Sequence, residues 1–253
     1  MKVLFSEYKS DYTNYIFPYA IWALPEGDET PADLFEKGFL PNKPDLSRFY
    51  LCRQVRVGLK DFTPSSENRR VLRKGEGVSY RLVGRRDFEF TPEWREFCKS
   101  YADARFGQDV MSYARLDALM NSPVVSHVMI FTDDESGRDV GIVFLYLQPQ
   151  RLAFYYYSFF DLDFPRKNLG MYLMTSAVRY FHEQGYDYIY LGSCYSRNAL
   201  YKTQFEGVQF FNGVRWSSDL AELKYLIDRD GGEVNRHLLE TGEYLEQFYP
   251  KSF

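Results

Sequence analysis

Basic side chains are concentrated in one stretch of the chain, where they would neutralise phosphate groups. The stretch from Arg48 to Arg86 contains eleven basic and three acidic residues, a net charge of +8, while the whole chain has a formal net charge of −4. Within it, the spacing i, i+1, i+4, i+5 places four cations along one side of a helix. Such segregation indicates a nucleic-acid backbone contact, and a solvated helix face is the alternative. The four cations are Arg69, Arg70, Arg73 and Lys74, and Arg56 from the same stretch is a fifth candidate for this site.

A second anion site is predicted where a strand meets a helix, at Arg166, Lys167 and Gly170. The free backbone N–H groups and the positive end of a helix favour an anion there. Gly170 has no Cβ and would let a ligand approach the first helical turn. The GNAT-type acetyltransferases carry a pyrophosphate-binding Arg/Gln-x-x-Gly-x-Gly/Ala turn at this place. In this chain the spacing to the first glycine differs by one residue, and Tyr172 replaces the second glycine.

Cysteine and hydropathy patterns exclude several classes of protein. Cys52, Cys98 and Cys194 form no CxxC pair and have no histidine near them in the sequence, so we expect no disulfide framework, no metal and no cofactor. The longest apolar stretches, such as 142–147, fall far short of the roughly 20 residues that a membrane helix needs. The N-terminus shows no signal-peptide pattern. We expect a soluble, cytoplasmic protein without membrane contact.

Periodicity and turn signals predict the elements that must position these residues. Aromatic clusters broken by prolines and glycines occupy residues 1–50, and aromatic residues make up 19% of the whole chain. Strands, a helix, a strand and a final helix follow one another in the second half, which indicates an α+β fold. The predicted helices cover 31–37, a short basic segment after 63–65, 93–104, 113–120, 168–184 and 198–205, and the predicted strands cover 51–59, 128–132, 140–147, 152–160 and 186–191.

Several short motifs follow one another in the order of one known family. They include Cys52-Arg53-Gln54-Val55-Arg56-Val57, continuing through Phe62, Pro64, Ser65, Arg69, Arg70 and Leu72; Phe160-Asp161-Leu162-Asp163; Asn168-Leu169-Gly170-Met171-Tyr172; Tyr190-Leu191-Gly192; and Tyr201-Lys202-x-x-Phe205. Over roughly residues 6–219 these patches resemble the arginyl- and leucyl-tRNA protein transferases, the N-end rule aminoacyltransferases, which are similar to GNAT enzymes. The family's N-terminal cysteine cluster has no counterpart near residues 6–9, so the chain resembles a divergent member.

The resemblance implies a fold, a reaction and partners. The fold would be GNAT-like, with a mixed, largely antiparallel sheet and an aromatic-rich N-terminal region. Residues 1–90 would form a region that binds tRNA or substrate, and residues 91–253 the transferase domain. The reaction would be aminolysis: the free α-amine of an acceptor protein attacks the ester of an aminoacyl-tRNA and takes its arginine or leucine. Such a reaction needs positioning, proton removal and oxyanion stabilisation rather than a covalent nucleophile.

In GNAT-like folds, donor and acceptor meet where two central strands separate, here 152–160 and 186–191. The resemblance places Tyr157, Asp161 and Tyr190 there as catalytic candidates, and Tyr195 and Lys202 as acceptor-binding candidates. The alternative for each tyrosine is packing in the core. Two other functions remain open at this point: a GNAT-type N-acyltransferase that uses acyl-CoA, and a non-catalytic relative that binds tRNA.

Overall fold

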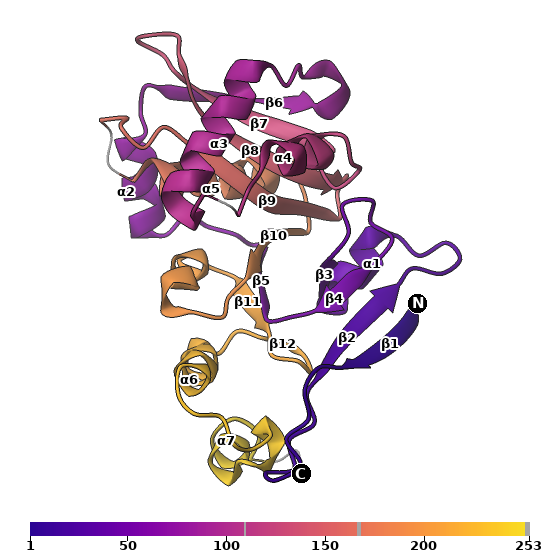
Figure 1. Ribbon diagram of the computed structural model, residues 1–253. Coiled ribbons are helices and arrows are strands. Elements are labelled where there is room, and N and C mark those ends of the chain that lie inside the picture. Colours follow the sequence, from indigo (N-terminus) through magenta and orange to yellow (C-terminus); the bar gives the residue numbers. More distant parts are fainter. Residues whose placement is uncertain (109, 166–167, 251–253) are drawn as a thin grey trace.

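An eight-stranded mixed sheet runs through the centre of this computed structural model, which describes residues 1–108, 110–165 and 168–250 (Figure 1). Its strand order is β12-β11-β5-β10-β9-β8-β7-β6. The strands are β5 (Gln54–Gly58), β6 (Val78–Gly84), β7 (His127–Asp133), β8 (Asp139–Gln148), β9 (Leu152–Phe160), β10 (Tyr188–Ser193), β11 (Val208–Phe211) and β12 (Trp216–Ser217).

One parallel pair interrupts this otherwise antiparallel sheet. Strands β6 to β9 form a meander, and helix α5 (Leu169–Glu183) then returns the chain so that β10 runs parallel to β9. On its other side β10 pairs with β5, which comes from the N-terminal part of the chain. This arrangement confirms the expected α+β, GNAT-like class with a mixed, largely antiparallel sheet.

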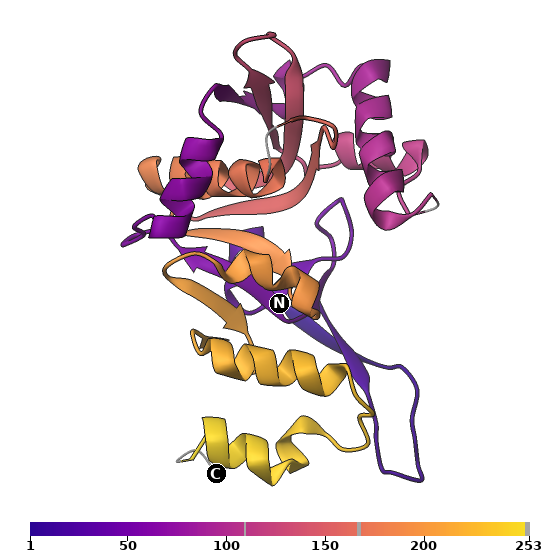
Figure 2. The same cartoon turned by 90° about the vertical axis from the view of Figure 1, so that its left-hand side faces the viewer.

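Helices cover both faces of the sheet, as Figure 2 shows with the sheet seen between them. Helices α3 (Pro92–Phe106) and α4 (Tyr113–Met120) pack on one face, where their apolar residues join those of β7 to β9 in a buried cluster. Helices α2 (Ser66–Lys74) and α5 cover the opposite face. The starts of α2, α3 and α4 follow local signals, because Ser65, Thr91 and Ser112 each accept a hydrogen bond from a backbone N–H in the first turn.

A smaller antiparallel sheet, in the order β1-β2-β4-β3, packs beside the central sheet. Between the two, the Phe35 ring packs edge-on against Phe49, Phe154 and Tyr190, at centroid distances of 4.9–6.2 Å. Much of the aromatic content of the N-terminal region therefore serves as core. Its elements are β1 (Lys2–Glu7), β2 (Tyr19–Leu24), α1 (Pro31–Glu36), β3 (Phe39–Pro41) and β4 (Phe49–Leu51).

The chain ends in a helical segment that is fixed by one buried carboxylate. Glu222 is 1% exposed and accepts hydrogen bonds from Ser217, Asn212 and Tyr244, at 2.6–2.8 Å. These bonds join β12, the preceding turn and the last helix, so the segment is tied to the sheet edge. Its elements are α6 (Leu220–Asp230), η3 (Leu238–Glu240) and α7 (Gly242–Phe248), and shorter 3-10 turns elsewhere are η1 (Arg85–Asp87) and η2 (Arg197–Thr203).

The predicted division into residues 1–90 and residues 91–253 separates strands that pair with each other in one sheet. Strands β5 and β6 precede residue 90, yet β5 pairs with β10 and β11, and β6 pairs with β7. The division at residue 90 stays a prediction. None of the helices in the described part of the chain is long and apolar enough to cross a bilayer.

Candidate active site at the fork between β9 and β10

The two parallel strands at the centre of the sheet separate after only three paired positions. Pairing joins Tyr188–Tyr190 of β10 to Leu152–Phe154 of β9 and extends no further, although both strands continue. Beyond that point β9 pairs only with β8, and β10 pairs only with β5, among the described residues. The result is a fork at the centre of the sheet.

A bulge lies just past the fork on each strand. Against β8 the register moves from Tyr155 to Tyr157, so Tyr156 is the extra residue of β9. Against β5 it moves from Tyr190 to Gly192, so Leu191 is the extra residue of β10. A bulge takes one residue out of the ladder and redirects its backbone groups, and bulges are common beside active sites. The fork is therefore lined by backbone that ladder pairing does not occupy.

Lys202 brings a cation to the fork. It lies on η2, and its ammonium group donates a hydrogen bond to the carbonyl of Ser193 at 2.8 Å. Gly192 precedes this carbonyl and has a φ of +81°, a backbone conformation that favours glycine; a Cβ there would lie 3.6 Å from Nζ, an ordinary contact distance. Partial burial lowers the pKa of Lys202, and the nearby thiols of Cys194 and Cys52 oppose that shift.

The cation at Lys202 lacks a matching carboxylate within the described part of the chain. Its one protein hydrogen bond is to the neutral carbonyl of Ser193. An ammonium has three donors, and a partly buried charge without a partner is costly. The two neighbouring cysteines do not supply a negative charge, since burial raises the pKa of Cys52 to about 12 and also raises that of Cys194. The site is thus suited to an incoming carboxylate.

A cavity of about 280 Å³ lies beside Cys52, one of the two thiols near this cation, on the side of the smaller sheet. Tyr195, an acceptor-binding candidate, lines it together with Cys52, Tyr50 and Trp22. The Tyr195 hydroxyl accepts a hydrogen bond from the backbone N–H of Arg53 at 2.8 Å, and its ring lies under the guanidinium of the same residue. Tyr195 is therefore held as a wall of the cavity.

Gln54 is a polar residue of the fork that our sequence reasoning did not single out. It lies on β5 opposite Ser193 and is fully buried. Neither its amide oxygen nor its amide nitrogen has a hydrogen-bond partner among the described residues. Buried amides are nearly always paired, so an unpaired one beside a fork indicates a place for water or ligand. The available signal was its position in the Cys52–Val57 motif.

The three predicted catalytic residues lie in different surroundings, and no contact joins them. Tyr157 faces the α4 side of the sheet, where Arg115 donates to its hydroxyl at 3.3 Å. Tyr190 is fully buried between the sheets, and its hydroxyl accepts from Arg56 at 3.3 Å. Burial raises the pKa of Tyr190 to about 12, which favours the neutral phenol. Their catalytic roles stay predictions.

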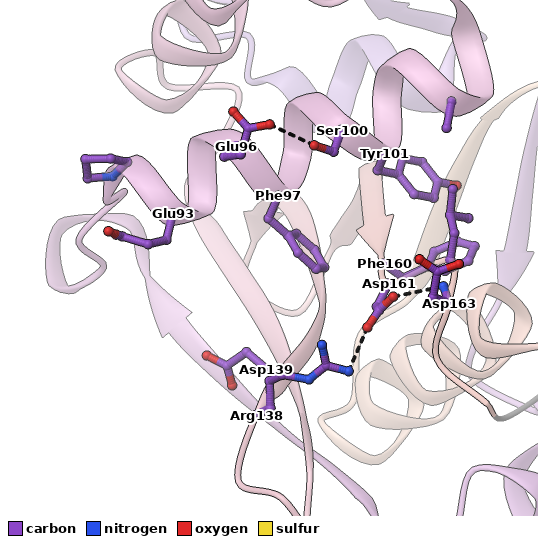
Figure 3. Close-up of a pocket in the computed structure, with 13 residues that line it drawn as sticks. Glu93, Glu96, Phe97, Ser100, Tyr101, Arg138, Asp139, Phe160, Asp161 and Asp163 are labelled. Atoms are coloured by element: carbon purple, nitrogen blue, oxygen red, sulfur yellow. Dashed lines mark hydrogen bonds and ion pairs between the residues drawn. The ribbon is translucent and has the colours of Figure 1, made fainter.

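Asp161 lines a cavity of about 960 Å³ between α3 and the end of β9 (Figure 3). Its carboxylate forms an ion pair with Arg138 at 2.8 Å and accepts the backbone N–H of Asp163 at 2.9 Å. Tyr101 and Phe160 pack against each other at 4.8 Å along the wall. The carboxylate of Asp161 is thus already paired, at a distance from the Lys202 contacts.

The basic residues predicted to bind the donor differ in availability. Arg56 is 7% exposed, and its guanidinium is sandwiched between Tyr188 and Trp216 at 4.0 and 3.9 Å. Arg70 pairs with Glu67. Arg69, Arg73 and Lys74 are exposed on α2.

The loop before α5 is only partly described. Arg166 and Lys167 lie outside the described residues. At Gly170 the space of the missing Cβ is taken by the Phe160 ring, whose nearest carbon would be 2.7 Å away. The glycine is therefore needed for close packing of α5 on β9, and its contact with a ligand stays a prediction.

The comparisons with known proteins agree on one family. The family model described as "Arginine-tRNA-protein transferase, C terminus" matches residues 93–212, from α3 past β11, and so includes the fork and Lys202. Over this stretch the chain is similar to the arginyl- and leucyl-tRNA protein transferases. The family's N-terminal cysteine cluster has no counterpart in this sequence, and the three cysteines that are present are free and buried. No cluster of three metal-binding side chains occurs among the residues that the structure describes.

Several similar proteins share one name, aspartate/glutamate leucyltransferase. The protein of Ruegeria pomeroyi is 24% identical over 213 residues, covering 81% of this chain and 73% of its own. That of Hyphomonas neptunium is 27% identical over 207 residues, covering 77% and 81%. Among solved structures, the C-terminal domain of a putative lysylphosphatidylglycerol synthetase from Agrobacterium fabrum is 17% identical, with a TM-score of 0.45, covering 65% of this chain and 51% of that one.

Proposed function

We propose that this protein is an aminoacyl-tRNA protein transferase that moves leucine from leucyl-tRNA to the α-amine of a protein whose first residue is aspartate or glutamate. The name of its relatives supports the choice of leucine and of acidic acceptors. The observation that carries the proposal is Lys202, a half-buried ammonium at the fork whose only hydrogen bond to the described residues is to a neutral carbonyl.

Lys202 would bind the side-chain carboxylate of the acceptor's first residue. A charge-assisted hydrogen bond between ammonium and carboxylate would offset the desolvation of both groups. It would also fix the acceptor's α-amine, which is only a few bonds from that carboxylate, beside the fork. The cavity next to Cys52 and Tyr195 then provides room for the following residues of the acceptor.

The chemistry at the fork is aminolysis of an ester. The neutral α-amine attacks the aminoacyl carbonyl, a C–N bond forms, and the C–O bond to the 3′ oxygen of the tRNA breaks. The amine loses one proton, and the departing oxygen gains one. A backbone N–H released by the bulge at Tyr156 would donate to the oxyanion of the intermediate, which is the kind of contact that contributes most to such reactions.

The location and partners follow from this reaction. The donor is an aminoacyl-tRNA and the acceptor is a protein N-terminus, and aminoacyl-tRNA places the reaction in the cytoplasm. Neither role uses a metal or a cofactor, because the ester itself is the activated group.

A matrix of donors and acceptors tests the proposal. Purified protein is incubated with radiolabelled leucyl-, arginyl- or lysyl-tRNA and with peptides that begin with Asp, Glu, Arg or Lys, and peptide label is counted. We expect label from leucyl-tRNA on the Asp and Glu peptides and none on their Nα-acetylated versions. Absence of transfer from every aminoacyl-tRNA, together with transfer from acetyl-CoA, would replace this function with that of a small-molecule acyltransferase.

A further inference from the structure

A basic pocket lies on the far side of the sheet from the α3 cavity, between α2 and α5. These two helices lie side by side in both views (Figures 1 and 2). The pocket measures about 390 Å³. Its lining is Arg69, Leu72, Arg73 and Glu76 from α2 and the turn after it, with Tyr172 and Arg179 from α5.

The two helices are locked together at the pocket. A Cβ on Gly75 would fall 2.0 Å from the Tyr172 ring, so only glycine permits this approach. The Tyr172 hydroxyl donates to the carbonyl of Val78 at 2.5 Å, and the amide of Asn68 donates to the carbonyl of Gln204 at 3.1 Å. The first bond ties α5 to β6, and the second ties α2 to the segment after η2. The backbones that carry the pocket's arginines are therefore fixed before any ligand arrives.

The guanidinium groups of the pocket are only partly neutralised by the protein. Arg69 donates to the neutral carbonyl of Pro64. The Nε of Arg179 lies 3.7 Å from Glu183, and its Nη2 lies 3.4 Å from the Tyr80 hydroxyl, so both contacts are long. Arg73 is exposed and belongs to no ion pair among the described residues. Glu76 is the one carboxylate in the described lining, and three arginines therefore face it.

We propose that this pocket binds a phosphodiester group of the tRNA backbone, with Arg179 of α5 completing the site begun by Arg69 and Arg73 of α2. Guanidinium groups match phosphate oxygens with paired N–H donors. The apolar faces of Leu72 and Tyr172 would contact the adjoining sugar. The inference rests on the proposed function for the identity of the RNA, and it assigns a contact to α5 that the basic helix alone does not predict.

Binding of deacylated leucine tRNA tests the pocket without requiring transfer. Affinity is measured for the full chain as a function of salt. We expect Arg179→Gln to weaken binding about 3- to 10-fold near 0.1 M salt and to reduce the slope of log affinity against log salt by about 0.7 to 0.9. The matched control is Arg236→Gln, which removes the same charge from an exposed site in the C-terminal segment and should change neither quantity. Equal effects of the two variants on tRNA affinity and on the salt slope would refute the proposal that this pocket binds tRNA.

Glu76→Gln should change tRNA affinity in the opposite direction. It removes the negative charge from the described lining, so tRNA affinity should rise about 2- to 5-fold, whereas Glu233→Gln at an exposed distant position should leave it unchanged. Inorganic phosphate is the second probe. Thermal stabilisation by phosphate that depends on Arg179, combined with unchanged tRNA binding in Arg179→Gln, would make this a site for small anions and overturn the RNA proposal.

Different results would refute the proposed phosphate contact and the proposed enzymatic function. A protein that transfers leucine with the same kcat/KM in wild type and Arg179→Gln over a range of tRNA concentrations would refute the pocket and leave the function intact. A protein that binds tRNA through Arg179 and transfers no amino acid would refute the function and leave the pocket intact.

Discussion

Replacing Lys202 by Met should remove the enzyme's preference for acidic acceptors. Met keeps the length and much of the apolar stem of lysine, so the change is mainly the loss of the ammonium. The wild-type ammonium makes one protein hydrogen bond, to Ser193 at 2.8 Å, and this leaves two donors for an acceptor carboxylate. Hydrogen bonds to charged groups contribute about 1.5–3 kcal/mol, which corresponds to about 10- to 150-fold in kcat/KM.

The assay compares peptides that begin with Asp and with Asn, which have nearly the same shape. In wild type, Asp should be preferred by about this factor. In Lys202→Met, kcat/KM for the Asp peptide should fall toward that for the Asn peptide, which should itself change little. Lys224→Met, at an exposed position of α6, is the matched control. Retention of the full Asp over Asn preference in Lys202→Met would refute the assignment of the acceptor site.

Three further predictions concern local geometry. Asp33 accepts the backbone N–H of Thr30, and this bond, with smaller contributions from other partners, lowers its pKa to about 2; Asp33→Ala should cost about 1–2 kcal/mol at pH 7. Because the folded pKa lies below the unfolded value, that difference should shrink as the pH falls below about 4, and urea unfolding at pH 7 and pH 3 measures it. Gly38→Ala places a methyl group 2.5 Å from the Phe211 ring at a φ of +90°, so the melting temperature should drop by several degrees, by calorimetry. Gly192→Ala, at a φ of +81°, should destabilise the protein by about 1–2 kcal/mol in urea unfolding and slow transfer to Asp peptides, since it shifts the loop under the ammonium; an unchanged rate would argue that the loop position is unimportant.

The elements with local signals were predictable from the sequence. Helix α4 and strand β9 have the predicted ends, and α1, α3 and α5 agree to within two residues, because caps, prolines and periodicity act over short distances. The fork between β9 and β10 was also expected, from the order of strands and the family resemblance. The 3-10 turn η2 replaces the α-helix predicted over 198–205, and it still delivers Lys202 to the fork.

The long-range features were not predictable from one sequence. The insertion of β5 between β10 and β11 joins residues 130 or more positions apart, and no local pattern encodes it. Arg56 illustrates the consequence: in the sequence it is one cation of a basic stretch, while in the fold it is enclosed by aromatic rings. The bulge at Tyr156 has no glycine to mark it, whereas Leu191 is followed by Gly192, whose φ is +81°.

Mass spectrometry of a single acceptor peptide tests the central claim most directly. A peptide that begins with Asp and contains an internal lysine is incubated with leucyl-tRNA and the purified protein, and the product is fragmented. The account predicts a gain of one leucine residue, attached at the α-amine of the first Asp, and a much lower yield of that product when Lys202→Met replaces wild type under the same limiting conditions. An unmodified peptide, or leucine attached at the internal lysine, would contradict it.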